Sequence, residues 1–138
     1  MAEFIMKDLA AKRGLNDLHV ESCATSTEEL GNDIYPPAKR CLSAHGIPYD
    51  HRSARQMTSD DYDRFDMIIA MDSWNIRNMR HFVNGDPGKK VSLMMSHCGR
   101  DTDVADPWYS GDFEKTYEDL TEACEALLDS FSDNEKEN

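Results

Sequence analysis

The sequence predicts an α/β fold: a three-layer, doubly wound parallel sheet that is covered by helices on both faces. Residues 67–71 (MIIAM) and 91–95 (VSLMM) are short, largely apolar runs, which are typical of parallel strands buried between two helix layers. Segments with the apolar spacing of helices precede, separate and follow these runs. Alternation of this kind favours a parallel sheet, because each connecting helix packs on one of its faces.

The first half of the chain alternates helices with a short strand. Residues 2–13 carry apolar side chains on one helical face and stop at Gly14, a residue that readily adopts the left-handed backbone of a helix C-cap. Residues 18–22 alternate apolar and polar side chains, which predicts a strand. Two prolines open a second helix over residues 36–45. Thr58 and the acidic residues after it have capping-box character and predict a short third helix.

The second half repeats the alternation around the two apolar strands. Asp72 and Ser73 follow residues 67–71 and are placed to cap the next helix. Residues 84–88 (NGDPG) predict a turn before the strand at 91–95. The final helix carries an apolar stripe that faces the sheet over several turns. Its apolar positions are Phe113, Tyr117, Leu120, Cys124, Leu127, Leu128 and Phe131.

Composition predicts one cytoplasmic domain. The 138 residues are 39% hydrophobic, which suits one core over residues 1–131, and residues 132–138 read as a disordered acidic tail. The formal net charge of −12 disfavours nucleic acid and anionic membrane surfaces as partners, because both would repel the chain. No stretch approaches the ~20 apolar residues that span a bilayer, and no basic-then-apolar leader begins the sequence.

The cysteines and histidines give no metal-binding pattern. No two of the four cysteines lie close enough for a C-x-x-C motif, and the five histidines show no H-x-x-x-H spacing. We therefore expect no metal site and no cofactor, and we expect the thiols to be reduced. The cysteines are Cys23, Cys41, Cys98 and Cys124.

Six short segments, taken together, resemble a known family. They are MAEF at 1–4, ESCATS at 21–26, HGI at 45–47, ARQ at 54–56, DMIIAMD at 66–72 and DVADPWY at 103–109. In order and spacing they are similar to the low-molecular-weight protein tyrosine phosphatases over essentially the whole chain. The resemblance implies a four-stranded α/β fold and hydrolysis of phosphotyrosine monoesters through a phosphocysteine. The substrate would be a phosphotyrosine protein or a small aryl phosphate.

The same comparison predicts that this chain lacks the family's first strand and phosphate-binding loop. Family members begin with a strand that leads into C-x5-R-S-P, directly before the segment that matches Met1. In that loop, backbone N–H groups and a bidentate arginine hold the phosphate while a cysteine thiolate attacks phosphorus. Here Cys98 has an arginine only two positions later, and the sixth positions after the other cysteines are Glu29, Ile47 and Ser130.

The resemblance assigns proton transfer and binding of the substrate ring to residues 106–109. Asp106 matches the general acid, which protonates the leaving phenolate and later activates water. Pro107 restricts the backbone of the residue before it. Trp108 and Tyr109 match the aromatic walls of the cleft, where a phosphotyrosine ring could stack. A simple turn with core aromatics is the alternative for this tetrapeptide taken alone.

Three further residues match positions that support the catalytic loop. Ser22 matches a residue that hydrogen-bonds the loop, and Asp72 and His51 match residues that brace the loop and cleft from behind. The alternative for Asp72 is a helix N-cap alone, and the alternative for His51 is an ordinary surface histidine.

Two other functions stay open. One is an inactive truncated remnant or binding module; the other, less favoured, is a protein-arginine phosphatase, whose distinguishing residue lies within the absent loop. The family's first strand runs between residues 18–22 and 67–71, so its absence would leave two backbone edges unpaired at roughly 1–3 kcal/mol per buried group. We therefore expect the 138-residue chain to be unstable, dimeric or strand-swapped.

Overall fold

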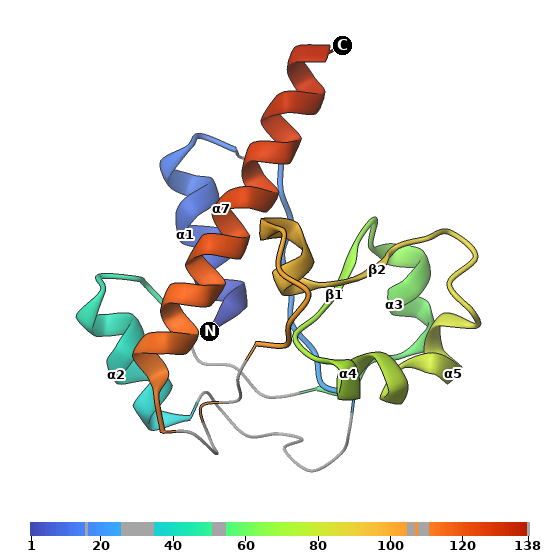
Figure 1. Cartoon of the computed structure of the whole chain (residues 1–138), viewed down its shortest axis with the longest axis horizontal. Helices are drawn as coiled ribbons and strands as arrows, with labels where there is room; N and C mark the ends of the chain where they lie inside the picture. The colour runs from blue at the N-terminus through green and yellow to red at the C-terminus, as the bar shows by residue number, and fades with distance from the viewer. Residues whose placement is uncertain (16, 26–34, 51–54, 105–106, 108–110, 138) are drawn as a thin grey trace.

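A computed structural model describes residues 1–15, 17–25, 35–50, 55–104, 107 and 111–137 of the chain (Figure 1). Helices and two strands alternate along the described segments, as the sequence predicts. The elements are α1 (Ala2–Lys12), α2 (Pro36–Ala44), α3 (Ser59–Arg64), β1 (Ile68–Ala70), α4 (Ser73–Asn78), α5 (Arg80–Val83), β2 (Val91–Leu93), the 3-10 helix η1 (Met94–Cys98) and α7 (Phe113–Glu137).

Strands β1 and β2 form a parallel sheet with helices on both sides. Ile68 pairs with Val91 and Ala70 with Leu93. Side chains on a strand point alternately to its two faces, and here Ile69 packs against the core that contains α1 and α7, whereas Ile68 and Ala70 belong to the core of α3, α4 and α5. The fold is therefore α/β, and the described residues contain a two-stranded part of the sheet.

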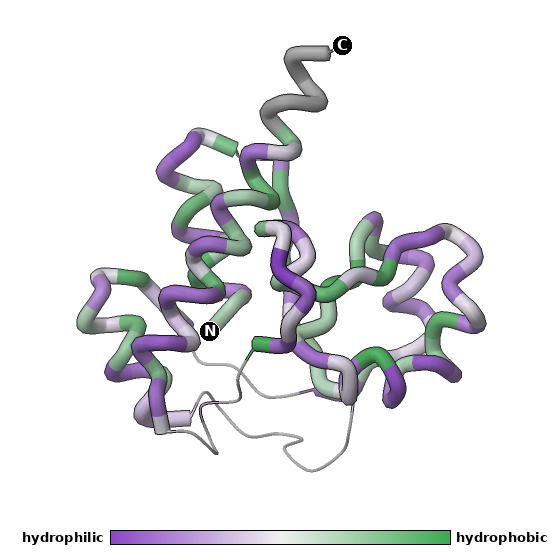
Figure 2. The backbone as a smooth tube through the Cα atoms, in the orientation of Figure 1, coloured by the Kyte–Doolittle hydropathy of each residue, from purple (hydrophilic) through white to green (hydrophobic). Residues whose placement is uncertain are grey.

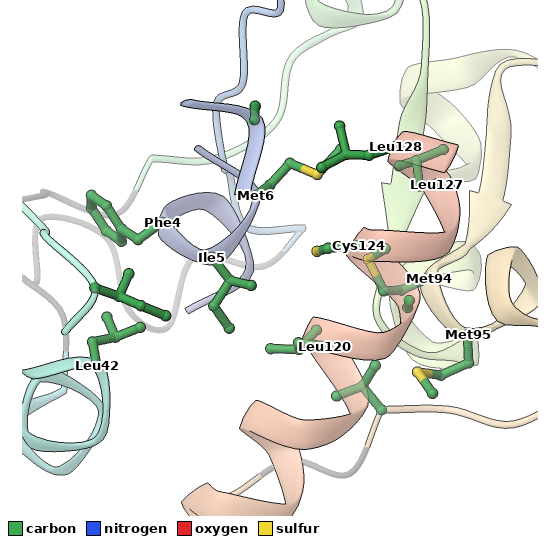
Figure 3. Close-up of a cluster of buried hydrophobic side chains, with 14 residues drawn as sticks. Phe4, Ile5, Met6, Leu42, Met94, Met95, Leu120, Cys124, Leu127 and Leu128 are labelled. Carbon is green, nitrogen blue, oxygen red and sulfur yellow. The ribbon is translucent and has the colours of Figure 1, made fainter. Parts of the chain in front are cut away.

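The larger core lies between α1, α7 and η1, with α2 at its edge (Figure 3). Leu42 and Leu128 are completely buried, and Ile5 and Cys124 are 1% exposed. Figure 2 shows hydrophobic and hydrophilic positions alternating along α1 and α7, as expected of helices with one inward face. Each such buried side chain contributes about 1.5–3 kcal/mol to stability.

A second, smaller core lies on the other face of the sheet. Its members are Met57, Tyr62, Ala70, Met79 and Val83.

The predicted turn at 84–88 is present, and Asp86 within it joins α3 to the start of β2. The hydroxyl of Tyr62 donates to Asp86 Oδ1 at 2.7 Å, and the backbone N–H groups of Lys90 and Val91 donate to the same carboxylate at 2.7 and 3.1 Å. This carboxylate therefore fixes where β2 begins.

The prediction of a strand at residues 18–22 is wrong for this chain. These residues form no strand in the structure, and the nearest pairing is an isolated parallel bridge between Ala24 and Gln56. A strand exists only through hydrogen bonds to a neighbour, and the described residues provide no neighbouring strand beside 18–22. Alternation of side chains marks a segment that could be a strand but does not supply its partner.

Three element boundaries also differ from the predicted ones. The helix after Asp72 divides into α4 and α5 at Met79, and the predicted strand at 91–95 ends at Leu93 because the next residues turn into η1. Helix α7 continues to Glu137, past the boundary predicted at residue 131. Among the described residues, no helix combines the length and the hydropathy needed to cross a bilayer.

The start of α3 is held by a buried carboxylate. Asp61 is 3% exposed and accepts two hydrogen bonds from the guanidinium of Arg55, at 2.9 and 3.0 Å, and one from the backbone N–H of Thr58 at 2.8 Å. The capping box predicted at Thr58 is confirmed. The hydrogen bonds from Arg55 are the main reason why the pKa of Asp61 lies below its ordinary value of 3.8.

We predict that Asp61→Asn lowers the free energy of unfolding at neutral pH by about 1–3 kcal/mol, because it leaves buried donors poorly matched. The native pKa of Asp61 is depressed, so its contribution is complete above pH 3.8 and is lost as pH falls through the native pKa. The difference between wild type and variant should therefore shrink on acidification. Urea unfolding across this range measures it, with the exposed Asp60→Asn as control; a difference that is independent of pH contradicts the assignment.

Candidate functional site

A cavity of about 1310 Å³ lies among the described residues of α1, β1 and α7. Its walls come from the start of α1, from residues 18–23, from residues 67–72 around β1, and from the inner face of α7. One edge of β1 is paired with β2. The other side of β1 and residues 18–23 thus border the same space. A segment or ligand inside the cavity could therefore hydrogen-bond to backbone on both sides.

The carboxyl end of β1 opens onto this cavity at Asp72. In open α/β sheets, ligands bind where strands end and helices begin, so this is the expected place for a site. Asp72 is the N-cap of α4: its Oδ1 accepts from the N–H of Asn75 at 2.8 Å, and Asn75 Oδ1 accepts from the N–H of Met71 at 3.1 Å. The N-cap role considered from sequence is therefore present. The support of a catalytic loop by Asp72 stays a prediction.

Ser22 faces the start of α1 across the cavity. Its hydroxyl donates to Glu3 Oε1 at 2.8 Å, and Lys7 Nζ donates to Glu3 Oε2 at the same distance. Glu3 is only 6% exposed, so these charge-assisted bonds help to offset the cost of burying its charge. Sequence reasoning missed Glu3 as a partner of Ser22; an acidic residue on the buried face of an amphipathic helix was the available signal.

The segment that precedes residues 105–110 is anchored beside the end of β1. The N–H of Val104 donates to Met71 O at 2.8 Å, and the carboxylate of Asp103 accepts from the N–H and hydroxyl of Ser73 at 3.1 and 3.2 Å. Pro107 lines the cavity.

Four of the predicted site residues lie outside the described residues. They are Asp106, Trp108, Tyr109 and His51. Their predicted roles therefore stay predictions.

Arg55 lines the cavity but does not resemble a phosphate clamp. Its guanidinium is committed to Asp61 through two hydrogen bonds, so much of its charge is already compensated. Its backbone carbonyl accepts from the N–H of Ala24 at 2.7 Å and thereby ties residues 18–25 to the start of α3. In this arrangement Arg55 shapes the cavity wall.

Three of the four thiols, those of Cys23, Cys41 and Cys124, are poor nucleophiles. Burial raises the pKa of Cys41 to about 11 and the pKa of Cys124 to about 12, and partial burial raises the pKa of Cys23. A nucleophilic cysteine needs the opposite shift, because the thiolate is the reactive form. Arg55 near Cys23 and the N-terminal ammonium near Cys41 and Cys124 act in that direction, but burial outweighs them and the pKa of each thiol stays raised.

The chain matches known proteins over almost its full length. A family model described as low molecular weight phosphotyrosine protein phosphatase matches residues 1–137. The low molecular weight protein-tyrosine-phosphatase YfkJ of Bacillus subtilis is 35% identical over 134 residues, which are 94% of this chain and 85% of YfkJ. A low molecular weight phosphotyrosine protein phosphatase of Gallus gallus is 33% identical over 135 residues, with coverage of 94% and 85%.

Solved structures give the same relationship. The crystal structure of YfkJ superposes with a TM-score of 0.90 at 34% identity, covering 96% of this chain and 86% of YfkJ. The crystal structure of DARP, a drosophila arginine phosphatase, superposes with a TM-score of 0.86 at 30% identity, covering 94% and 86%. The family model and these relatives align with almost the whole sequence, and the backbone of YfkJ superposes over 96% of it. This chain therefore belongs to the low molecular weight phosphotyrosine protein phosphatase family.

Proposed function

We propose that this protein hydrolyses phosphotyrosine monoesters, with Asp106 as the general acid and base and Trp108 and Tyr109 against the substrate ring. The observation that carries the proposal is the cavity at the carboxyl end of β1, which Pro107, the residue after Asp106, helps to line. The tyrosine-phosphatase names of YfkJ and the chicken relative support the substrate class.

The reaction has two steps and needs a thiolate nucleophile and a group that transfers protons. In the first step a thiolate attacks phosphorus, the P–O bond to the phenol breaks, and the acid donates its proton to the leaving phenolate oxygen. In the second step the resulting carboxylate takes a proton from water, which attacks the phosphocysteine and releases phosphate and thiolate. Asp106 provides the proton transfers of both steps.

We further propose that the nucleophile and phosphate clamp come from a strand and C-x5-R loop that residues 1–138 do not contain. No cysteine in the sequence has an arginine six positions later, and burial raises the pKa of Cys41 and Cys124. The cavity between residues 18–23 and β1 lies where such a strand would pair with backbone on both sides. Ser22 and Asp72 border this space and would then support the loop.

Residues 1–138 alone should therefore show no burst and negligible turnover of an aryl phosphate. When the N-terminal strand and C-x5-R-S-P loop of a family member are joined ahead of Met1, turnover should appear. In that longer chain Asp106→Asn should lower kcat by about 10²–10⁴-fold, the usual size of general-acid catalysis. Stopped-flow release of p-nitrophenol measures burst and steady state, and Asp101→Asn, an exposed neighbour, is the matched control.

Turnover by residues 1–138 that survives alkylation of all four cysteines would overturn this account. Equal loss of activity in the Asp106 and Asp101 variants would remove the assignment of the acid.

Two alternatives predict different results. An inactive remnant or binding module predicts a stop codon when the coding DNA upstream of Met1 is read in frame, whereas a working phosphatase predicts a strand followed by C-x5-R-S-P. The similarity to DARP favours phosphoarginine as a second candidate substrate. Comparing phosphotyrosine and phosphoarginine hydrolysis by the chain that carries the added strand and C-x5-R-S-P loop distinguishes the two.

Among the described residues β1 pairs only with β2, and residues 18–22 pair with no strand, which gives a prediction about assembly. Unpaired strand backbone is a template for pairing with another chain, so the 138-residue protein should self-associate or unfold without a sharp transition. Sedimentation velocity and thermal unfolding measure this. A monomer that unfolds cooperatively would show that the cavity imposes no such requirement.

A further inference from the structure

A cluster of three metal-ligand side chains links α2 and the residue that follows it to the first turn of α7. Cys41 and His45 are four residues apart, so they lie on one face of the helix. Glu114 is in the first turn of α7. None of the three lines the central cavity, and none has a part in the proposed phosphatase reaction.

The three donor atoms are close enough to share one ion. His45 Nε2 lies 2.8 Å from Glu114 Oε2, Cys41 Sγ lies 3.7 Å from Glu114 Oε1, and the chosen ligand atoms all lie within 4.8 Å of one another. Bonds of 2.0–2.3 Å to a tetrahedral zinc ion separate its ligands by roughly 3.3–3.8 Å. Small side-chain movements would therefore bring the three donor atoms to the spacing of tetrahedral zinc ligands.

The surroundings hold the ligands in place. The ring of His45 stacks on Tyr117 of α7, with centroids 3.6 Å apart and planes 13° apart. The thiol of Cys41 donates to the carbonyl of Phe113 at 3.6 Å. Because α7 thus contacts both α2 ligands as well as supplying the third, the donors are positioned before any ion binds, and this lowers the entropy cost of binding.

One ligand of the cluster is buried and the other two are partly or largely exposed, which suits the binding of an ion from solvent. Cys41 is 6% exposed, whereas the side chains of His45 and Glu114 are 30% and 59% exposed. The sulfur is shielded, and the ion can enter from the side of the imidazole and carboxylate. That open side also leaves room for water as a fourth ligand.

We propose that Cys41, His45 and Glu114 bind a zinc ion that joins α2 to α7. Thiolate, imidazole and carboxylate form a donor set that selects zinc over calcium or magnesium, which prefer all-oxygen ligands. Binding displaces the thiol proton to solvent. The ion stabilises the folded chain through its binding energy.

The test is titration of the metal-free, reduced 138-residue chain with Zn²⁺ and with Co²⁺ as a spectroscopic probe. We expect one ion per chain, a thiolate-to-cobalt charge-transfer band, and a rise in the thermal unfolding midpoint with Zn²⁺. Glu114→Gln should weaken Zn²⁺ affinity by at least about 10-fold, and His45→Gln and Cys41→Ser by about 100-fold or more. Loss of a group that only hydrogen-bonds a metal ligand already costs about 10–100-fold in affinity, and loss of a ligand itself should cost at least as much.

Matched controls separate this site from general attraction of cations to an acidic protein. Glu118→Gln changes an exposed carboxylate one turn further along α7, and His81→Gln and Cys98→Ser change residues outside the cluster. All three should bind as wild type does. Glu114 is exposed, so its variant tests the site even if Cys41→Ser perturbs folding. Equal affinity in Glu114→Gln and Glu118→Gln, or a cobalt spectrum without the charge-transfer band, would overturn the proposal.

Discussion

The packing of α7 is the interaction on which the rest of the structure depends. Its buried stripe shares one core with Ile5 of α1 and with Met94 and Met95 of η1, and Ile69 of β1 packs against that core. These three elements are far apart in sequence, and α7 packs into one core with them. Because β1 is positioned against this core, the carboxyl end of β1, with Asp72 at its tip, is positioned as well.

The second constraint is that strand backbone needs hydrogen-bond partners, which the packing of apolar side chains does not provide. β1 is paired on one side with β2, whereas residues 18–22 have the side-chain pattern of a strand without being one. Apolar side chains such as Val20, Met71 and Leu127 line the space between them. At about 25 cal/mol per Å² of apolar surface removed from water, an apolar strand would gain from entering that space as well as from its hydrogen bonds. Under the proposed function, that strand would be the one that carries the C-x5-R loop.

Local patterns predicted the helices well because capping and periodicity act over a few residues. Helix α2 begins at Pro36 as expected, and α3 follows the Thr58 capping box. What the sequence could not provide was pairing over long distances. The contact of Ser22 with Glu3 spans 19 residues, and the failed strand at 18–22 shows that alternation without a partner is insufficient. The N-cap position of Asp72 could be predicted because it directly follows the clearest apolar strand, whereas its support of a catalytic loop rests on the resemblance and stays a prediction.

If Cys41, His45 and Glu114 bind zinc as proposed, motif spacing alone would have missed the site. Searches for C-x-x-C or H-x-x-x-H pass over a mixed pair four residues apart, and Glu114 lies 69 residues beyond His45. Helix α2 also borders the central cavity through Pro36, Ala38 and Lys39. An ion that fixes the far end of α2 to α7 would therefore restrain the wall of the substrate cavity without contacting a substrate. Zinc binding at the proposed site would then influence the shape of the cavity through α2.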